Sequence, residues 1–202
     1  MINHKLKIIL NDKNDGYINL PISILKIHQN NFPFYVKIIT KLDLEFVIGV
    51  KEFNVEENFI ALPEWLMEHL LLNPFEDVLI KIHPKPPNLK YLSLQTKQKD
   101  FFDIPNYDTF LENHLSNFST ITINQIIYLE INNQNYQFNV IDLIGEDFNQ
   151  FYSLVNQDIN VDIKYHQLEQ EPKENKKENV EEQKQLTTKE LREQRLKYFN
   201  KK

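Results

Sequence analysis

The sequence contains no cysteine and only three glycines among its 202 residues. The lack of cysteine excludes disulfides, thiolate zinc sites and cysteine nucleophiles. Gly16, Gly49 and Gly145 are too few and too widely spaced for the glycine-rich loops that hold nucleotide phosphates. No stretch approaches the roughly 18 consecutive apolar residues that span a bilayer, and the first residues lack the layout of a signal peptide. We therefore expect a soluble protein without membrane insertion.

Charge is distributed unevenly along the chain. Residues 1–168 hold 21 of the 29 acidic and 13 of the 23 basic residues, a net charge of −8, whereas residues 169–202 carry +2. Both arginines, Arg192 and Arg195, lie in the second stretch. Because phosphate backbones are bound by clustered Lys and Arg, an acidic body without arginine is not expected to bind nucleic acid.

The first half alternates short strands with two short helices. Pro21 and Pro63 stand at positions that favour the first turn of a helix, and Trp65, Leu66 and His69 share one face of the second helix. Runs of β-branched and aromatic residues predict strands at 6–10, 34–40, 45–53, 59–61, 77–82 and 89–94. Two helices among so many strands indicate an α+β barrel or roll rather than a βαβ sheet.

The pattern of apolar residues changes in the second half. Apolar residues between Tyr107 and Phe118 recur at helical spacing, and they are followed by alternating segments at 126–131 and 136–144 around the turn Asn132-Asn133. Further strands are expected near 151–155 and 159–163. This half therefore predicts a helix packed on a small sheet.

The last part of the chain loses its apolar residues from about Leu168 onward, which is typical of a charged linker. Thr187 and Glu190 have the spacing of a capping box and precede an amphipathic stretch, which predicts a short terminal helix. Its apolar and basic side chains are the type that anchors interfaces, although a helix that docks back or frays is an equal alternative. The candidate partner-binding residues are Leu191, Arg192, Arg195, Leu196, Tyr198 and Phe199.

Groups that could carry catalysis are scattered. The six histidines form no metal-binding pattern, and His69 and His114 are expected to be packed histidines on apolar helix faces. The adjacent carboxylates Glu76-Asp77 and Glu146-Asp147 are expected to form turns. The proline-rich segment 83–87 reads as a spacer between strands, with peptide recognition as the weaker alternative. We expect no catalytic residues, no metal site and no cofactor.

Six blocks of the sequence, in order, resemble the ubiquitin fusion degradation protein 1 family. The block LPEWLMEHL is the most specific of them, since it is similar to the family's LPxWMMxxL. The blocks are DGYINLP (15–21, with Ser23 and Leu25), GVKEF (49–53), LPEWLMEHL (62–70), DFFDI (100–104), LENHLSNF (111–118) and DINVD (158–162). Most of their large residues are core residues, so they report the fold rather than a contact surface.

The resemblance implies an α+β fold: a double-psi β-barrel subdomain at 1–98 and a small α/β roll at 99–168. The charged linker and the short helix would then occupy 169–202. It also implies a non-enzymatic adaptor that binds ubiquitin and polyubiquitin chains. The implied partners are a valosin-containing-protein-type AAA ATPase and a nuclear-protein-localisation-4-type protein, in cytoplasm and nucleus, including the cytosolic face of the endoplasmic reticulum.

The sequence departs from the family pattern in one respect. The family's glycine-containing F-x-G-x-G boxes, which dock on the ATPase, have no counterpart here because no glycine follows Gly145. Two alternatives therefore stay open beside the ubiquitin adaptor. One is a diverged adaptor of a copied degradation machinery used for organellar protein translocation, and the other is an interaction scaffold that has lost ubiquitin binding.

Overall fold

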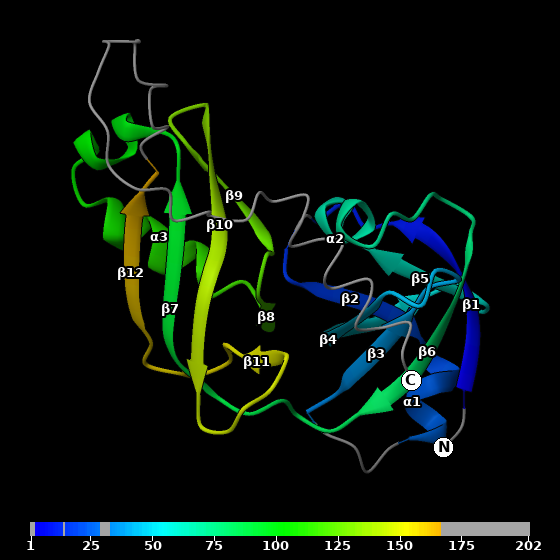
Figure 1. Ribbon diagram of the computed structural model, residues 1–202. Coiled ribbons are helices and arrows are strands. Elements are labelled where there is room, and N and C mark those ends of the chain that lie inside the picture. Colours follow the sequence, from blue (N-terminus) through cyan, green and yellow to red (C-terminus); the bar gives the residue numbers. More distant parts are fainter. Residues whose placement is uncertain (1–2, 14, 29–32, 167–202) are drawn as a thin grey trace, which may run out of the picture. The chain divides into compact units, whose positions relative to one another are not determined.

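The computed structural model describes residues 3–13, 15–28 and 33–166 (Figure 1). The chain divides into two units, 1–168 and 169–202, and all of the described residues lie in the first. In these ranges no helix is long and apolar enough to cross a membrane. The elements in chain order are β1 (Asn3–Leu10), β2 (Tyr17–Pro21), α1 (Ile22–Ile27), β3 (Tyr35–Ile39), β4 (Glu45–Val55), β5 (Phe59–Leu62), α2 (Glu64–His69), β6 (Asp77–His83), β7 (Leu89–Thr96), the 3₁₀ helix η1 (Lys99–Asp103), α3 (Tyr107–Leu115), β8 (Thr120–Thr122), β9 (Ile126–Ile131), β10 (Gln134–Gly145), β11 (Phe151–Ser153) and β12 (Asn160–Tyr165).

Six strands close into a barrel in the order β1-β5-β2-β4-β3-β6, and β6 pairs with β1. β1 is parallel to β5 and β2 is parallel to β4, whereas the other neighbours are antiparallel. Alternate residues point inward, so that Leu6 and Ile8 of β1 and Val36 and Ile38 of β3 are buried. The predicted α+β class with a barrel subdomain is confirmed.

Both short helices of the barrel begin directly after a proline. Pro21 and Pro63 have φ values of −67° with extended ψ values, and α1 and α2 start at the next residue. Proline suits this position because it fixes φ and because the N–H that it lacks would have no partner inside the helix. α2 buries Trp65, Leu66 and Met67, as the predicted apolar face requires.

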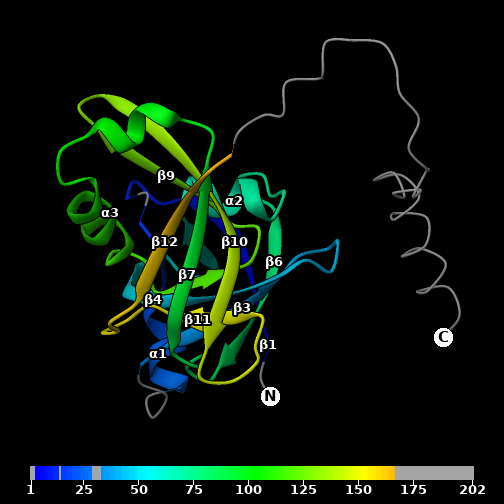
Figure 2. The same ribbon diagram turned by 60° about the vertical axis from the view of Figure 1, so that its left-hand side comes forward.

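The remaining strands form a four-stranded sheet in the order β12-β7-β10-β9 and a two-stranded sheet of β11 and β8 (Figures 1 and 2). β7 pairs with β10 and β12 and with no barrel strand. The sequence prediction had placed this strand in the barrel, with a boundary at residue 98, and that placement is wrong. The chain leaves the barrel after β6, and the proline-rich segment 84–87 joins the two parts.

A cluster of aromatic rings supports the four-stranded sheet. The ring of Phe101 in η1 lies 4.8 Å from that of Phe138 on β10 and 5.1 Å from that of Tyr107 on α3, measured between centroids. Leu111 and Leu115 of α3 are buried in the same core. The predicted helix on a small sheet is therefore present (Figure 2).

Ser119 ties this second part to the barrel. Its hydroxyl donates to the carbonyl oxygen of Gly16 at 2.7 Å and accepts from the N–H of Gly49 at 2.8 Å, and all of these groups are buried. A Cβ atom at Gly16 would lie 2.3 Å from the Cα of Phe118, and one at Gly49 would lie 2.7 Å from the Cβ of Ser119. Two of the three glycines thus permit close approach of backbones at this junction.

Candidate protein-binding surface

The two half-buried histidines on α2 and α3 pack against aromatic side chains. Burial lowers the pKa of His69 on α2, whose ring lies edge-on to Phe46. Burial also lowers the pKa of His114 on α3, while a hydrogen bond to the backbone of Tyr128 acts in the opposite direction. Both histidines therefore favour the neutral form. Within residues 3–13, 15–28 and 33–166, no group of three or more His, Asp or Glu side chains could hold a metal ion.

A histidine pair joins β1 to the end of α1. The Nε2 atoms of His4 and His28 are 3.1 Å apart, and the ring centroids are 5.4 Å apart. The centroid distance exceeds the Nε2–Nε2 distance by about the sum of the two ring radii. The two Nε2 atoms therefore lie close to the line that joins the ring centroids. This geometry fits a hydrogen bond in which one ring donates its N–H to the ring nitrogen of the other. Burial, and then the charge of His28, lowers the pKa of His4.

The adjacent carboxylates have structural partners. Asp77 forms an ion pair with Lys5 at 3.0 Å, and this interaction lowers its pKa. Glu76 accepts the N–H of Asn73 at 3.1 Å in the turn before β6. In the second pair, the N–H of Glu146 donates to the carbonyl oxygen of Asn88 at 3.1 Å, and the side-chain amide of Asn88 donates to the Glu146 carboxylate at 3.4 Å.

One end of the barrel collects several exposed apolar side chains. β1 ends at Leu10, the connection between β3 and β4 contains Leu42 and Leu44, and the connection between α2 and β6 contains Leu71 and Phe75. The strand pairing brings these segments to the same end, because the end of β1, the end of β3 and the start of β6 are neighbours. We call Leu10, Leu42, Leu44, Leu71 and Phe75 the apolar barrel end.

The backbone presents two of these residues in an unusual conformation. Leu71 and Phe75 have φ values of 54° and 66°, and their side chains are 68% and 69% exposed. A bulky residue in the left-handed region costs about 1–2 kcal/mol, so such residues are found mostly where the surrounding structure or a function requires them. The N–H of Phe75 donates to the carbonyl oxygen of Ile8 at 2.8 Å, which fixes this connection against β1. The side chains are thus held outward.

Charges of both signs surround the apolar barrel end. Glu68 on α2 and Asp43 between β3 and β4 are acidic, whereas Lys7 and Lys41 lie close enough to influence the pKa of Asp77. An exposed apolar cluster with a mixed polar rim is typical of a protein-binding surface.

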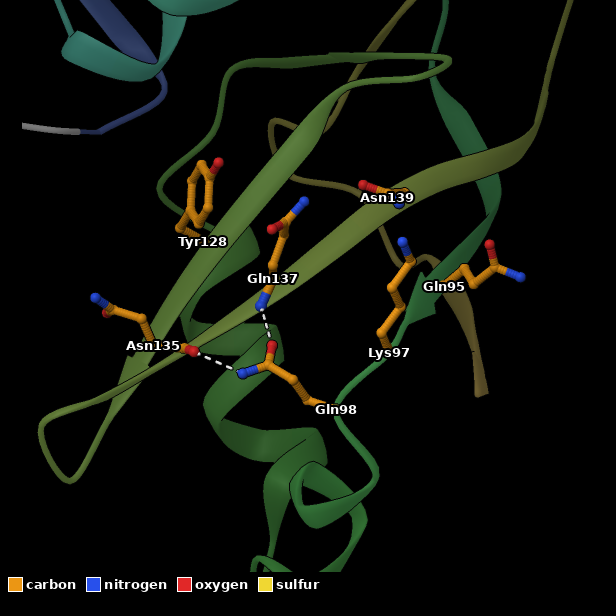
Figure 3. Close-up of a pocket in the computed structure, with 7 residues that line it drawn as sticks. All are labelled: Gln95, Lys97, Gln98, Tyr128, Asn135, Gln137 and Asn139. Atoms are coloured by element: carbon orange, nitrogen blue, oxygen red, sulfur yellow. Dashed lines mark hydrogen bonds between the residues drawn. The ribbon is translucent and has the colours of Figure 1, made fainter. Parts of the chain in front are cut away.

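A second feature is a polar hollow of about 370 Å³ on the four-stranded sheet (Figure 3). The side chain of Gln98 donates to the carbonyl oxygen of Asn135 at 2.9 Å and accepts the N–H of Gln137 at 2.7 Å. The side-chain amide of Gln98 therefore bonds to the backbone of β10 just beyond the end of β7, as the backbone of a further strand residue would. The residues that line the hollow are Gln95, Lys97, Gln98, Tyr128, Asn135, Gln137 and Asn139.

The lining of this hollow is polar and almost uncharged. It holds no carboxylate and no histidine, and Lys97 is its single charged side chain. Its amide side chains can donate and accept hydrogen bonds. We place the candidate site at the apolar barrel end instead, because exposed apolar side chains are the type that a protein partner buries.

The residues predicted to bind a partner, Leu191, Arg192, Arg195, Leu196, Tyr198 and Phe199, lie outside the described residues. They stay a prediction. Sequence reasoning did not find the apolar barrel end, because Leu71 and Phe75 follow a helix and read as core residues. It also missed the His4–His28 pair, whose members are 24 positions apart.

The fold and the exposed surface describe a binding module built from a closed barrel and a second, open sheet. Two family models match these two parts of the chain. Residues 4–86 match the family described as "Ubiquitin fusion degradation protein UFD1, N-terminal subdomain 1", and residues 88–166 match "N-terminal subdomain 2" of the same protein. The chain therefore belongs to the ubiquitin fusion degradation protein 1 family.

Individual relatives share about a third of the aligned residues. Ubiquitin fusion degradation protein 1 of Schizosaccharomyces pombe is 38% identical over 115 residues, which cover 57% of this chain and 33% of the relative. Ubiquitin recognition factor in ER-associated degradation protein 1 of Homo sapiens is 32% identical over 164 residues, which cover 76% of this chain and 51% of the relative. The chain thus spans between a third and a half of the length of these relatives.

Proposed function

We propose that the chain is a non-enzymatic adaptor that binds ubiquitin and polyubiquitin chains and presents the attached proteins for degradation. The observation that carries this proposal is the match of both family subdomains to residues 4–86 and 88–166. The names of the relatives, which refer to ubiquitin fusion degradation and to ubiquitin recognition in ER-associated degradation, support it.

The finer part of the proposal concerns delivery. The chain would hand ubiquitylated proteins to a valosin-containing-protein-type AAA ATPase together with a nuclear-protein-localisation-4-type partner. This work would take place in the cytoplasm and nucleus and at the cytosolic face of the endoplasmic reticulum. Residues 191–199 would contribute to partner binding, since they hold both arginines and an aromatic pair.

Within this proposal the apolar barrel end is the surface that contacts ubiquitin. Burial of Leu42, Leu71 and Phe75 would remove exposed apolar area, and each such side chain is worth about 1.5–3 kcal/mol when it is fully buried. Because Leu71 and Phe75 are already held outward, little conformational freedom is lost on binding. Linked ubiquitins would bind more tightly than single ones, because a second contact on the same chain has a high effective concentration.

The test is a binding titration of the full chain with ubiquitin and with ubiquitin chains. The barrel-end variant carries Leu42→Ser, Leu71→Asn and Phe75→Gly, since Asn and Gly accept positive φ. We expect its affinity to fall about tenfold or more, as is typical when central apolar contacts are removed. Phe148→Ser is the matched control, because Phe148 is 104% exposed and lies between β10 and β11.

A chain shortened by residues 186–202 tests the second part of the proposal. It should keep ubiquitin binding and lose binding to the ATPase or its partner.

Two negative results would have different meanings for the proposal. Unchanged ubiquitin affinity in the barrel-end variant would show that another surface binds ubiquitin. A lack of binding to both ubiquitin and its chains by the unaltered protein would contradict the adaptor function itself.

A further inference from the structure

The edge of the four-stranded sheet has an unpaired row of backbone groups. β12 is an edge strand, parallel to β7, and the N–H of His166 donates to the carbonyl oxygen of Thr96 at 2.8 Å (Figure 1). Because hydrogen bonding alternates along a parallel strand, Asp162 and Lys164 also bond to β7. The N–H and C=O groups of the residues between them therefore face away from the sheet. No described residue pairs with this outer edge.

The side chains of β12 divide cleanly between the two faces of the sheet. Val161 and Ile163 pair with Leu92 and Leu94 of β7, so they lie on the face that holds the core. Tyr165 lies on the same face, since side chains alternate along a strand. Val161 and Tyr165 are 40% and 39% exposed although they border the core. The strand thus offers an apolar row as well as free backbone groups.

The opposite face of β12 carries one charge of each sign. Asp162 and Lys164 are adjacent on this face, and their charged atoms are 3.6 Å apart within the chain. Both side chains are about half exposed. Asp162 also accepts the hydroxyl of Tyr91 at 3.3 Å. Because a carboxylate accepts several hydrogen bonds, both charged groups can still pair with a strand that lies alongside β12.

The sequence of β12 is complementary to itself when two copies run antiparallel about Ile163. In that register Ile163 faces Ile163 of the second copy, and Val161 faces Tyr165. On the other face Asp162 of each copy stands opposite Lys164 of the other, which gives two ion pairs between directly opposed residues. The three outward-facing residues would also form hydrogen-bonded pairs with the second copy.

Other registers do not match opposite charges and apolar side chains in this way. Centring the pair on Asp162 opposes two aspartates, and centring it on Lys164 opposes two lysines, each of which is destabilising. A slip by one residue in one copy places the apolar row against charged side chains. Charge complementarity therefore selects both the partner and the register.

We propose that β12 is the pairing edge of a symmetric dimer of this chain, in which two four-stranded sheets join into one sheet of eight. The interface is of the two-fold type, since the same residues contribute from both copies. This association does not depend on ubiquitin binding, and either proposal can fail without the other.

The decisive experiment uses charge exchange in the full chain, followed by sedimentation equilibrium over a range of concentrations. Asp162→Lys or Lys164→Asp alone opposes like charges twice, so we expect each variant to dimerise about tenfold or more weakly than the unaltered chain. An equimolar mixture of the two variants restores both ion pairs and should form heterodimers. The double variant, with Asp162→Lys and Lys164→Asp, should dimerise like the unaltered chain.

A cross-link checks the register. The chain has no cysteine, so Ile163→Cys places one thiol in each copy, at a Cα separation of about 5.5 Å that suits a disulfide. Val161→Cys is the matched control, because residue 161 faces residue 165 and should cross-link poorly. A chain that stays monomeric at all concentrations, a mixture that does not associate, or equal cross-linking of both variants would overturn the proposal.

Discussion

The barrel and the four-stranded sheet differ in whether their outermost strands are paired on both sides. In the barrel every strand has two neighbours, because β6 pairs with β1. In the sheet the described residues leave β9 and β12 with one strand neighbour each. A closed barrel has no backbone edge to offer, so its exposed apolar groups lie in the connections at its end, whereas the sheet exposes a strand edge.

The two proposals give the two regions different partners. The apolar barrel end presents side chains on fixed connections, which suits a folded domain such as ubiquitin. The edge of β12 presents backbone groups and alternating side chains, which suit another strand. Both regions nevertheless share one hydrophobic core, to which the buried residues of each belong.

The largest expected effect comes from Phe46, which links the two regions. Its ring contacts Trp65 and His69 in the barrel and Phe151 of β11, at centroid distances of 5.4–5.7 Å. Phe46→Ala should lower the free energy of unfolding by about 3–5 kcal/mol, because it leaves a cavity at this junction. Urea unfolding followed by Trp65 fluorescence and by circular dichroism measures the loss. Since the cavity affects both regions, the two probes should still coincide; a transition that splits would show that they unfold separately.

A smaller effect is expected at Ser119, which joins the regions by hydrogen bonds. Ser119→Ala leaves the N–H of Gly49 and the carbonyl oxygen of Gly16 with one partner fewer in a buried site. We expect a loss of about 1–3 kcal/mol in the free energy of unfolding. Ser116→Ala is the matched control, since its hydroxyl donates to Asn113 on the exposed end of α3 and should matter by less than about 0.5 kcal/mol. Equal losses in the two variants would contradict the bonding role of Ser119.

The smallest effect concerns pH. Burial lowers the pKa of His4, His69 and His114 in the folded protein below their ordinary value of 6.5. The unfolded chain therefore binds more protons, and stability should fall as the pH drops from about 7 through the lowered pKa values. His4→Gln should make this dependence shallower, which urea unfolding at several pH values between 5 and 8 can measure. An unchanged slope would contradict the contribution of His4.

Local patterns in the sequence predict much of the fold. Pro21 and Pro63 mark the starts of α1 and α2, and the apolar period within α3 predicts the third helix, because these signals act within a few residues. The placement of β7 could not be derived in this way. Its sequence fits either sheet, and its pairing depends on β10 and β12, which lie far along the chain.

The candidate surface was harder to predict than the fold. Leu71 and Phe75 look like core residues in the sequence, and only their positive φ values and their exposure distinguish them. The family resemblance supplied the ubiquitin hypothesis, but its shared blocks consist largely of buried residues such as Trp65 and Phe118. Residues that maintain a fold do not identify the surface that binds a partner.

The most direct test of the central claim is an amide-shift titration of the isotopically labelled full chain with ubiquitin chains. We predict saturable shifts around Leu10, residues 42–44 and residues 71–76, with tighter binding for chains than for single ubiquitin. The polar hollow around Gln98 and Gln137 should show no shifts. Shifts confined to that hollow, or no shifts at all, would contradict the account.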